Sequence, residues 1–466
     1  MRRPTAVWFG CGLLLLGVAG TASGDPPAEP PPSYRYVVSA DAQIDTLSVR
    51  VCFDGAAPQS FGPGVAGAGR ALLEARDSRG RALPTRGGRI DLGSLRPDDC
   101  MRYRVDLDLA IRASRFARRY GRDLVSSQGV WLWRDLRAVP AHGATLWFDM
   151  PEGIHANAPW PRINGVHQLG PSAFRRPGFV SFGRRPARII ERERVRARFV
   201  RLGDGWNISE ADLGQWLTEA IDGISTVQGR FPVDDLLIVL VPTRGDSIGF
   251  AMVRRGGGHA AAFMVGRDAR VETLRSSWVT WHELSHLHLP ALPQEDAWLY
   301  EGVATYYQEI LRVRLGIQTQ EQAWAHLLDG FERGARGGAR GSLRQASASL
   351  FSGGSFSRVY WAGTAFALEA DVSLRRRGSS LDAALRRAGD RWRGDLGLKS
   401  GADVCATWDR PLDAQVLVPL RDRYSRRRGF PGTRSLLERL GVRTGEAGLA
   451  LGGAELSRLR DAIMRR

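Results

Sequence analysis

The amino-acid sequence predicts an α+β protein in which a β-rich N-terminal domain precedes a mixed sheet and a run of helices. Three observations lead to this fold class. Strand-like runs dominate the chain up to about residue 185, three more strand-like runs and a patterned helix follow, and helical patterns fill the remainder. Strands followed by segregated helices are typical of α+β folds. A chain of 466 residues is long enough for several domains.

The N-terminus has the composition of a secretory signal. Arg2 and Arg3 precede an apolar run from Ala6 to Ala19, and small residues follow up to Gly24. The run is short for a membrane span. We therefore expect residues 1–24 to be a signal peptide, residues 25–33 to be a proline-rich leader, and the mature chain to be periplasmic or secreted. An uncleaved N-terminal anchor is the alternative.

Residues 34–185 are expected to form a β-sandwich-like domain. The runs YRYVVSA, TLSVRVCF and ATLWFDM alternate or are continuously apolar, with turn residues between them. A weaker helical pattern occurs in RASRFARRYGRDL. Because an exported chain meets an oxidising compartment, we expect Cys52 to pair with Cys100 and Cys405 to stay free.

We expect residues 186–345 to form the second domain and residues 346–466 to form a C-terminal helical domain. Ser209 and Asp212 begin a helix that continues to Gln228 with one apolar stripe. LLIVLVP, IGFAMV and AAFMVG are typical of strands. Two helices follow, one over about 269–289 and one from about 295 past 310, and Pro290 and Pro293 lie between them.

The net charge of +17 comes almost wholly from arginine, and Lys399 is the only lysine. The arginines are spread along the chain rather than clustered with aromatic residues, so the charge does not indicate a specific nucleic-acid site. It favours a solvated basic surface, which could contact an anionic cell envelope electrostatically.

The clearest chemical motif is His282-Glu283-Leu284-Ser285-His286. Residues i and i+4 of a helix share a face, so both imidazoles can bind one metal ion. Glu283 is displaced by about 100° around the helix axis and can reach a water molecule at that ion. The pattern therefore indicates a zinc site with a general base.

A third ligand comes from the following helix, in Trp298-Leu299-Tyr300-Glu301-Gly302. Zinc in hydrolases is typically held by three protein ligands, with one position left open. The prolines force a turn, and an antiparallel return of about 6–7.5 Å along each helix brings Glu301 level with the histidines. We expect one Zn²⁺ ion bound by His282, His286 and Glu301.

These motifs resemble the gluzincin metallopeptidases, which share a thermolysin-like catalytic domain. The segment WLYEGVATYYQEI and the block over 360–392 are similar to the glycyl aminopeptidase family, and Tyr360 falls on the position of that family's catalytic tyrosine. The resemblance implies that Tyr360 donates a hydrogen bond to the oxyanion. The chain after the helical part is too short for the PDZ domain common in the family, and we expect none.

The family's substrate-binding strand carries Gly-Gly-x-Glu, whose glutamate holds a free peptide N-terminus. The matching region here is Gly256-Gly257-Gly258-His259, without a glutamate. We expect Gly256, Gly257 and Gly258 to let an extended substrate backbone approach closely. Aminopeptidase and endopeptidase action both stay open.

The sequence thus predicts an exported zinc peptidase that acts on a peptide or protein substrate, with Glu283 as general base. The alternative is a catalytically weak or inactive peptidase-fold protein that binds peptides or the cell envelope. A basic nucleic-acid-binding protein ranks last. The oligomeric state is not predicted.

Overall fold

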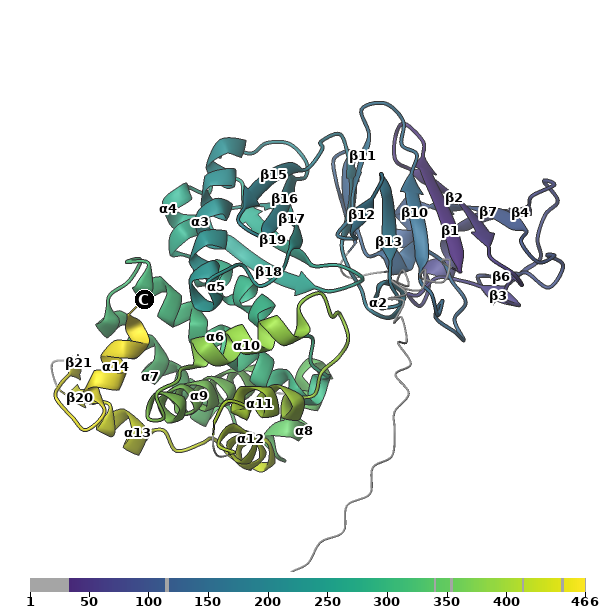
Figure 1. Ribbon diagram of the computed structural model, residues 1–466. Helices are drawn as coiled ribbons and strands as arrows, with labels where there is room; N and C mark the ends of the chain where they lie inside the picture. The colour runs from purple at the N-terminus through teal and green to yellow at the C-terminus, as the bar shows by residue number, and fades with distance from the viewer. Residues whose placement is uncertain are drawn as a thin grey trace, which may run out of the picture. The chain divides into compact units, whose positions relative to one another are not determined.

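The computed structural model describes residues 33–113, 117–338, 341–352, 355–412, 415–445 and 448–465. The expected signal peptide and all but the last residue of the leader lie outside the described residues. The predicted α+β fold class is confirmed, with an N-terminal sheet domain, a five-stranded sheet and a C-terminal helical region (Figure 1). No helix in the described part of the chain has the length and apolar character needed to cross a membrane.

The N-terminal domain is built on a seven-stranded sheet with the order β12-β13-β10-β1-β2-β7-β4. Its strands are β1 Tyr34–Ala40, β2 Thr46–Phe53, β4 Leu72–Asp77, β7 Cys100–Asp106, β10 Ala144–Phe148, β12 Arg162–Ile163 and β13 Val166–Leu169. Neighbours β2 and β7 pair so that Cys52 faces Cys100, and the two form a disulfide. Cys405 is buried and free.

Two smaller sheets complete this domain. A three-stranded sheet comprises β3 Ser60–Phe61, β5 Thr85–Arg86 and β6 Arg89–Asp91, and a four-stranded sheet comprises β8 Arg118–Tyr120, β9 Asp123–Ser126, β11 His155–Asn157 and β14 Val180–Gly183. The helical reading of RASRFARRYGRDL is wrong for its second half, because β8 and β9 pair there as a hairpin. Burial of all four residues of β9 explains the strand. Helices α1 Leu107–Arg112 and α2 Ser172–Arg175 are short.

The five-stranded sheet has the order β15-β16-β17-β19-β18 and lies next to helix α3 (Figure 1). Its strands are β15 Arg188–Arg192, β16 Val195–Arg201, β17 Asp235–Thr243, β18 Ile248–Arg254 and β19 Ala260–Gly266. The helix α3 Glu210–Gln228 begins where predicted, with the Ser209 side chain accepting a hydrogen bond from the Asp212 backbone. Strand β18 is an edge strand that pairs with β19 alone.

The expected helix over 269–289 is divided. Ser277 is extended, so that α4 Val271–Ser276 ends before α5 Trp278–Ser285 begins, and the 3-10 turn η3 His286–His288 follows. After the prolines, the turn η4 Gln294–Asp296 leads into α6 Ala297–Arg314. The His282–His286 motif therefore spans α5 and the turn η3, and the glutamate motif lies on the next helix, α6, as predicted.

The remaining described elements are mainly helical and belong to the same buried cluster as the five-stranded sheet, a cluster that extends from Ile190 to Met464. They are α7 Gln320–Arg336, α8 Leu343–Ala348, α9 Phe356–Arg375, α10 Leu381–Trp392, α11 Gly401–Asp409, α12 Leu417–Arg426, α13 Arg434–Arg439, β20 Val442–Gly445, β21 Gly448–Leu451 and α14 Ser457–Met464. The proposed domain boundaries at 185/186 and 345/346 stay predictions.

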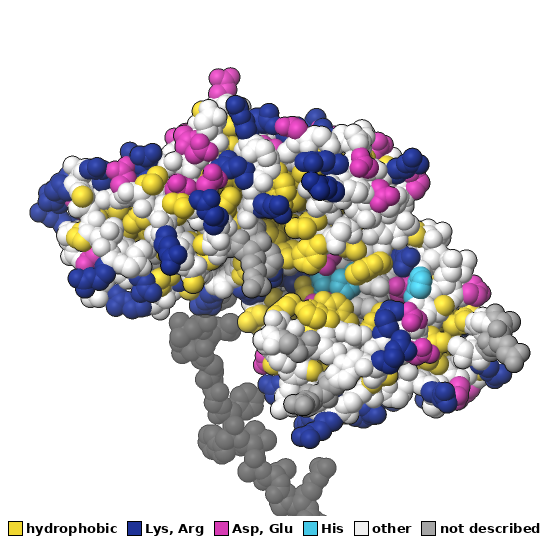
Figure 2. All heavy atoms as spheres, turned by 180° about the vertical axis from the view of Figure 1, so that it is seen from behind, with side chains coloured by type: hydrophobic (Ala, Val, Ile, Leu, Met, Phe, Trp, Pro, Cys, Tyr) yellow, Lys and Arg dark blue, Asp and Glu magenta, His cyan; other side chains and the backbone are white. Residues whose placement is uncertain are grey.

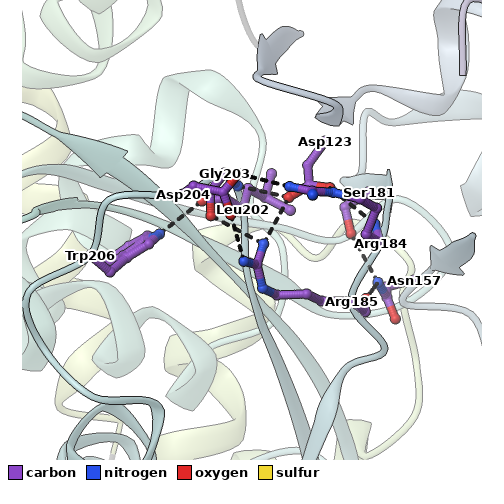
Figure 3. Close-up of polar contacts among 9 residues, drawn as sticks. All are labelled: Asp123, Asn157, Ser181, Arg184, Arg185, Leu202, Gly203, Asp204 and Trp206. Carbon is purple, nitrogen blue, oxygen red and sulfur yellow. Dashed lines mark hydrogen bonds and ion pairs between the residues drawn. The ribbon is translucent and has the colours of Figure 1, made fainter. Parts of the chain in front are cut away.

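A buried carboxylate joins the four-stranded sheet to the end of β16 (Figure 3). Asp123 is 1% exposed and accepts hydrogen bonds from the backbone nitrogens of Gly203 (2.8 Å) and Arg184 (3.0 Å) and from the Arg185 guanidinium (3.2 Å). Both arginines also contact the exposed Asp204. Each carboxylate oxygen of Asp123 thus has a partner, which makes its burial tolerable.

Candidate metal centre

Three predicted ligands converge on one point. The Nε2 atoms of His282 and His286 lie 3.3 Å and 3.4 Å from Oε2 of Glu301, and one ligand atom from each residue lies within 4.8 Å of the others. Both histidines are buried, and the Glu301 side chain is 12% exposed. Two imidazoles and a carboxylate form a donor set that suits zinc in hydrolases. The residues present therefore fit the ion that the sequence predicts.

A glycine contact between two helices brings Tyr360 to this group. A Cβ atom on Gly302 of α6 would lie 2.1 Å from the carbonyl carbon of Gly363 of α9, so only glycine permits this approach. Glu301 precedes Gly302, and Tyr360 lies about one turn before Gly363. As a result the Tyr360 ring is nearly parallel to that of His282, with centroids 5.8 Å apart.

Burial and the neighbouring charges shift the ionisation of these groups in the metal-free protein. Burial raises the pKa of Glu283 to about 8, although the His282 and Arg254 charges and a hydrogen bond from the Val253 backbone act the other way. Burial also raises the pKa of Glu301, but the two histidines outweigh it and leave the pKa well below its usual range. Burial lowers the pKa of His286 to about 4, which leaves its imidazole neutral near pH 7, as a metal ligand must be.

Glu283, His286 and Glu301 border a cleft of about 470 Å³. The edge strand β18 supplies Phe250 to Arg254 along the cleft, and Tyr360 lies among its lining residues. In Figure 2, histidine side chains appear in a hollow that is bordered by hydrophobic side chains. Among the described residues that line the cleft, the only acidic ones are Glu283 and Glu301.

The three glycines expected at the substrate lie elsewhere. Gly256, Gly257 and Gly258 are buried between β18 and β19 against the N-terminal domain. A Cβ on Gly258 would lie 1.9 Å from the Pro159 carbonyl oxygen, and the indole of Trp160 donates a hydrogen bond to the Gly256 carbonyl. Their small size therefore serves close packing of two parts of the chain, and β18 lines the cleft instead.

Arg255 and Tyr300 support His286; Arg255 was not singled out from the sequence, and Tyr300 was named there only within the glutamate motif. The Arg255 guanidinium donates hydrogen bonds to the carbonyl oxygens of His286 and Leu289, both at 2.7 Å, and to the Tyr300 hydroxyl at 3.0 Å. This places a buried cation on carbonyl oxygens at the end of the helical segment, where a positive charge is favourable. An arginine in an arginine-rich chain carries no signal of this role.

Gln308 supports the other histidine. Its Oε1 atom lies 3.0 Å from Nδ1 of His282, and its side chain is buried. The sequence could have predicted this role. Gln308 follows Glu301 by seven residues and therefore lies on the same face of α6 two turns later.

Known proteins share this fold and part of the sequence. A family model described as M61 glycyl aminopeptidase matches residues 289–371. Among curated proteins none matches the chain significantly. An aminopeptidase N family protein from Idiomarina loihiensis has a TM-score of 0.65 at 14% identity, over 88% of this chain and 78% of that chain.

An M1 zinc metallopeptidase from Deinococcus radiodurans has a TM-score of 0.53 at 16% identity, over 86% of this chain and 94% of its own. An E323A mutant from the same organism was solved bound to a Tyr-Ser-Ala substrate and has a TM-score of 0.52 at 16% identity, with the same coverage. At these identities the structures establish the fold. The family match covers the glutamate motif and Tyr360, so that over this segment the chain is similar to the M61 glycyl aminopeptidases.

Proposed function

We propose that this protein is a gluzincin-type metallopeptidase that hydrolyses peptide bonds, with one Zn²⁺ ion held by His282, His286 and Glu301 and with Glu283 as the general base. The convergence of the three ligand atoms carries the proposal. When bound, zinc acidifies water and polarises the scissile carbonyl.

Glu283 takes one proton from the attacking water and later transfers it to the leaving nitrogen, which returns the carboxylate to its ionised form. Although burial favours the neutral form of Glu283, a dication beside the carboxylate favours the charged form that a base needs. The Tyr360 hydroxyl donates a hydrogen bond to the oxygen on which negative charge develops. Burial and the charge of Glu301 raise the pKa of Tyr360, so it keeps its proton for this donation.

We further infer that a free N-terminus is not required in the substrate. The two acidic residues of the cleft are both used, one as ligand and one as base, and Arg254 adds positive charge beside them. The exposed edge of β18 offers backbone groups to an extended peptide, which supports binding of an internal segment.

We also propose export to the periplasm or the medium, supported by the charged and apolar pattern of residues 1–24 and by the disulfide between Cys52 and Cys100. Electrostatic contact with an anionic envelope is compatible with the excess of arginine. N-terminal sequencing of protein recovered from the cell fractions tests export, since an intact Met1 in a cytoplasmic fraction would contradict it.

The function is tested on the purified protein by measuring bound zinc and then profiling a peptide library with free and acetylated N-termini. We expect about one zinc per chain and cleavage of both sets. Cleavage confined to free N-termini would overturn the inference on substrate ends. Zinc binding without any turnover would favour the alternative, a peptidase fold retained for binding peptides or the envelope.

A further inference from the structure

A chain of hydrogen bonds runs from His282 away from the metal site. Oε1 of Gln308 lies 3.0 Å from Nδ1 of His282, and Nε2 of Gln308 lies 2.9 Å from Oε1 of Glu309. Glu309 is 2% exposed, so its carboxylate depends on protein partners. Its far oxygen, Oε2, receives three donors: Gln318 Nε2 at 2.8 Å, His326 Nδ1 at 3.1 Å and Arg312 at 3.3 Å.

The chemistry of these groups allows one direction of donation. Burial alone would raise the pKa of Glu309, but hydrogen bonds from His326, Gln308 and Gln318 outweigh it and keep the pKa below its usual value, so the group is a carboxylate. A carboxylate only accepts, hence Gln308 must turn its NH₂ group toward Glu309 and its carbonyl oxygen toward His282. That oxygen also only accepts, so Nδ1 of His282 must carry the proton. In the neutral imidazole that a metal ion requires, the lone pair of His282 is then on Nε2, the atom that faces Glu301.

We propose that Glu309, which does not touch the metal site, is a positioning residue that sets the tautomer of His282 through Gln308. This inference rests on the proposed zinc site. It goes beyond that site because Glu309, which is separated from His282 by two hydrogen bonds, is expected to influence the affinity for zinc. Polar partners of metal-binding histidines typically change metal affinity by about 10- to 100-fold when they are removed.

The substitution Glu309→Gln should reverse the direction of the chain rather than merely weaken it. Three donors face the Oε2 position, so an amide at 309 turns its oxygen there and its NH₂ group toward Gln308. Gln308 then presents its oxygen to that NH₂ group and its own NH₂ group to His282. Nδ1 must now accept, which moves the proton to Nε2 and blocks coordination.

The matched variant carries both Gln308→Glu and Glu309→Gln. It restores the original direction, because the carboxylate now accepts directly from Nδ1 of His282 while the amide at 309 satisfies the surrounding donors as before. The control is Thr305→Val, which removes a hydroxyl 3.5 Å from the same Nδ1 atom, too far for a strong hydrogen bond, and leaves the chain intact.

The test is competition of each purified full-length variant against a chromogenic chelator for zinc, with circular dichroism to verify folding. We expect about 10- to 100-fold weaker zinc binding for Glu309→Gln. The double variant and Thr305→Val should lie within about 3-fold of the parent, since both keep the direction of donation. In ¹⁵N-histidine spectra of the metal-free proteins, recorded at a pH above the raised pKa of His282 so that its imidazole is neutral, His282 should carry its proton on Nδ1 in the parent and on Nε2 in Glu309→Gln.

Parent-like zinc affinity in Glu309→Gln would overturn the inference, and so would a folded double variant that binds zinc no better than the single one. Failure of the parent itself to bind zinc is a separate result, which would overturn the proposed function.

Discussion

The phenol ring of Tyr300 lies almost flat against the imidazole of His286, with ring centroids 4.0 Å apart and planes 11° from parallel. The two residues come from different helical segments, η3 and α6, and the hydroxyl of Tyr300 accepts a hydrogen bond from Arg255. Nδ1 of His286 has no hydrogen-bond partner within the described residues. The ring contact therefore fixes the imidazole of His286, whereas a hydrogen bond with Gln308 fixes the imidazole of His282.

This relationship predicts that the ring of Tyr300, rather than its hydroxyl, sustains zinc binding. Tyr300→Phe keeps the stacked ring and should bind zinc within about 3-fold of the parent, whereas Tyr300→Ala should bind at least about 10-fold more weakly. Chelator competition measures both. Equal losses in the two variants would assign the effect to the hydroxyl and to Arg255.

Replacing the general base should separate turnover from metal binding. Glu283→Gln keeps the shape of the side chain but removes its basicity, so kcat should fall by about 10²- to 10⁴-fold while zinc content is unchanged. Glu272→Gln, on the exposed surface of α4, is the control and should match the parent. Substantial turnover by a zinc-loaded Glu283→Gln protein would refute the assignment.

Tyr360→Phe tests stabilisation of the oxyanion. The ring remains beside His282, so zinc content should be retained, and the loss of one donor should lower kcat by about 10²- to 10³-fold with little change in KM. Steady-state kinetics with one good peptide substrate measures the two parameters. A rise in KM at constant kcat would instead place Tyr360 in ground-state binding.

The buried carboxylate of Asp123 should stabilise the protein far more than its exposed neighbour. Asp123→Ala leaves two backbone N–H groups and a guanidinium without their acceptor, which should cost about 3 kcal/mol in free energy of unfolding. Asp204→Ala removes a carboxylate that is 62% exposed and contacts the same arginines, and should cost under about 1 kcal/mol. Urea unfolding compares them, and similar losses would contradict a special role for the buried group (Figure 3).

His167 should make the protein sensitive to mild acid. Burial lowers its pKa to about 4 in the folded protein, below the ordinary value of 6.5. The unfolded chain therefore binds the proton first, and the contribution of His167 to stability is complete above pH 6.5 and is lost as the pH falls toward 4. The slope approaches about 1.4 kcal/mol per pH unit.

The variant His167→Asn keeps a donor for the Trp160 carbonyl but does not titrate. Its unfolding free energy, measured in urea between pH 7 and pH 4.5, should decline less steeply than that of the parent. Parallel declines would show that His167 does not contribute to acid sensitivity.

The sequence alone determined the elements whose signals are local. Period and capping residues located α3, the apolar runs located β17, β18 and β19, and the four-residue spacing of His282 and His286 put them on one helix face. Helix length and the intervening prolines were enough to bring Glu301 level with them, because helical rise is nearly invariant.

Only the tertiary structure decided which residues support those ligands. Gly256, Gly257 and Gly258 looked like a substrate strand, yet they serve close packing against Pro159, a contact about a hundred residues away in the chain. Glu309 and His326 meet across two helices, and Arg255, which directly follows β18, reaches the carbonyl of His286. The packing of helices and strands decides which buried polar groups become hydrogen-bond partners. Neither the periodicity nor the composition of the sequence contains that information.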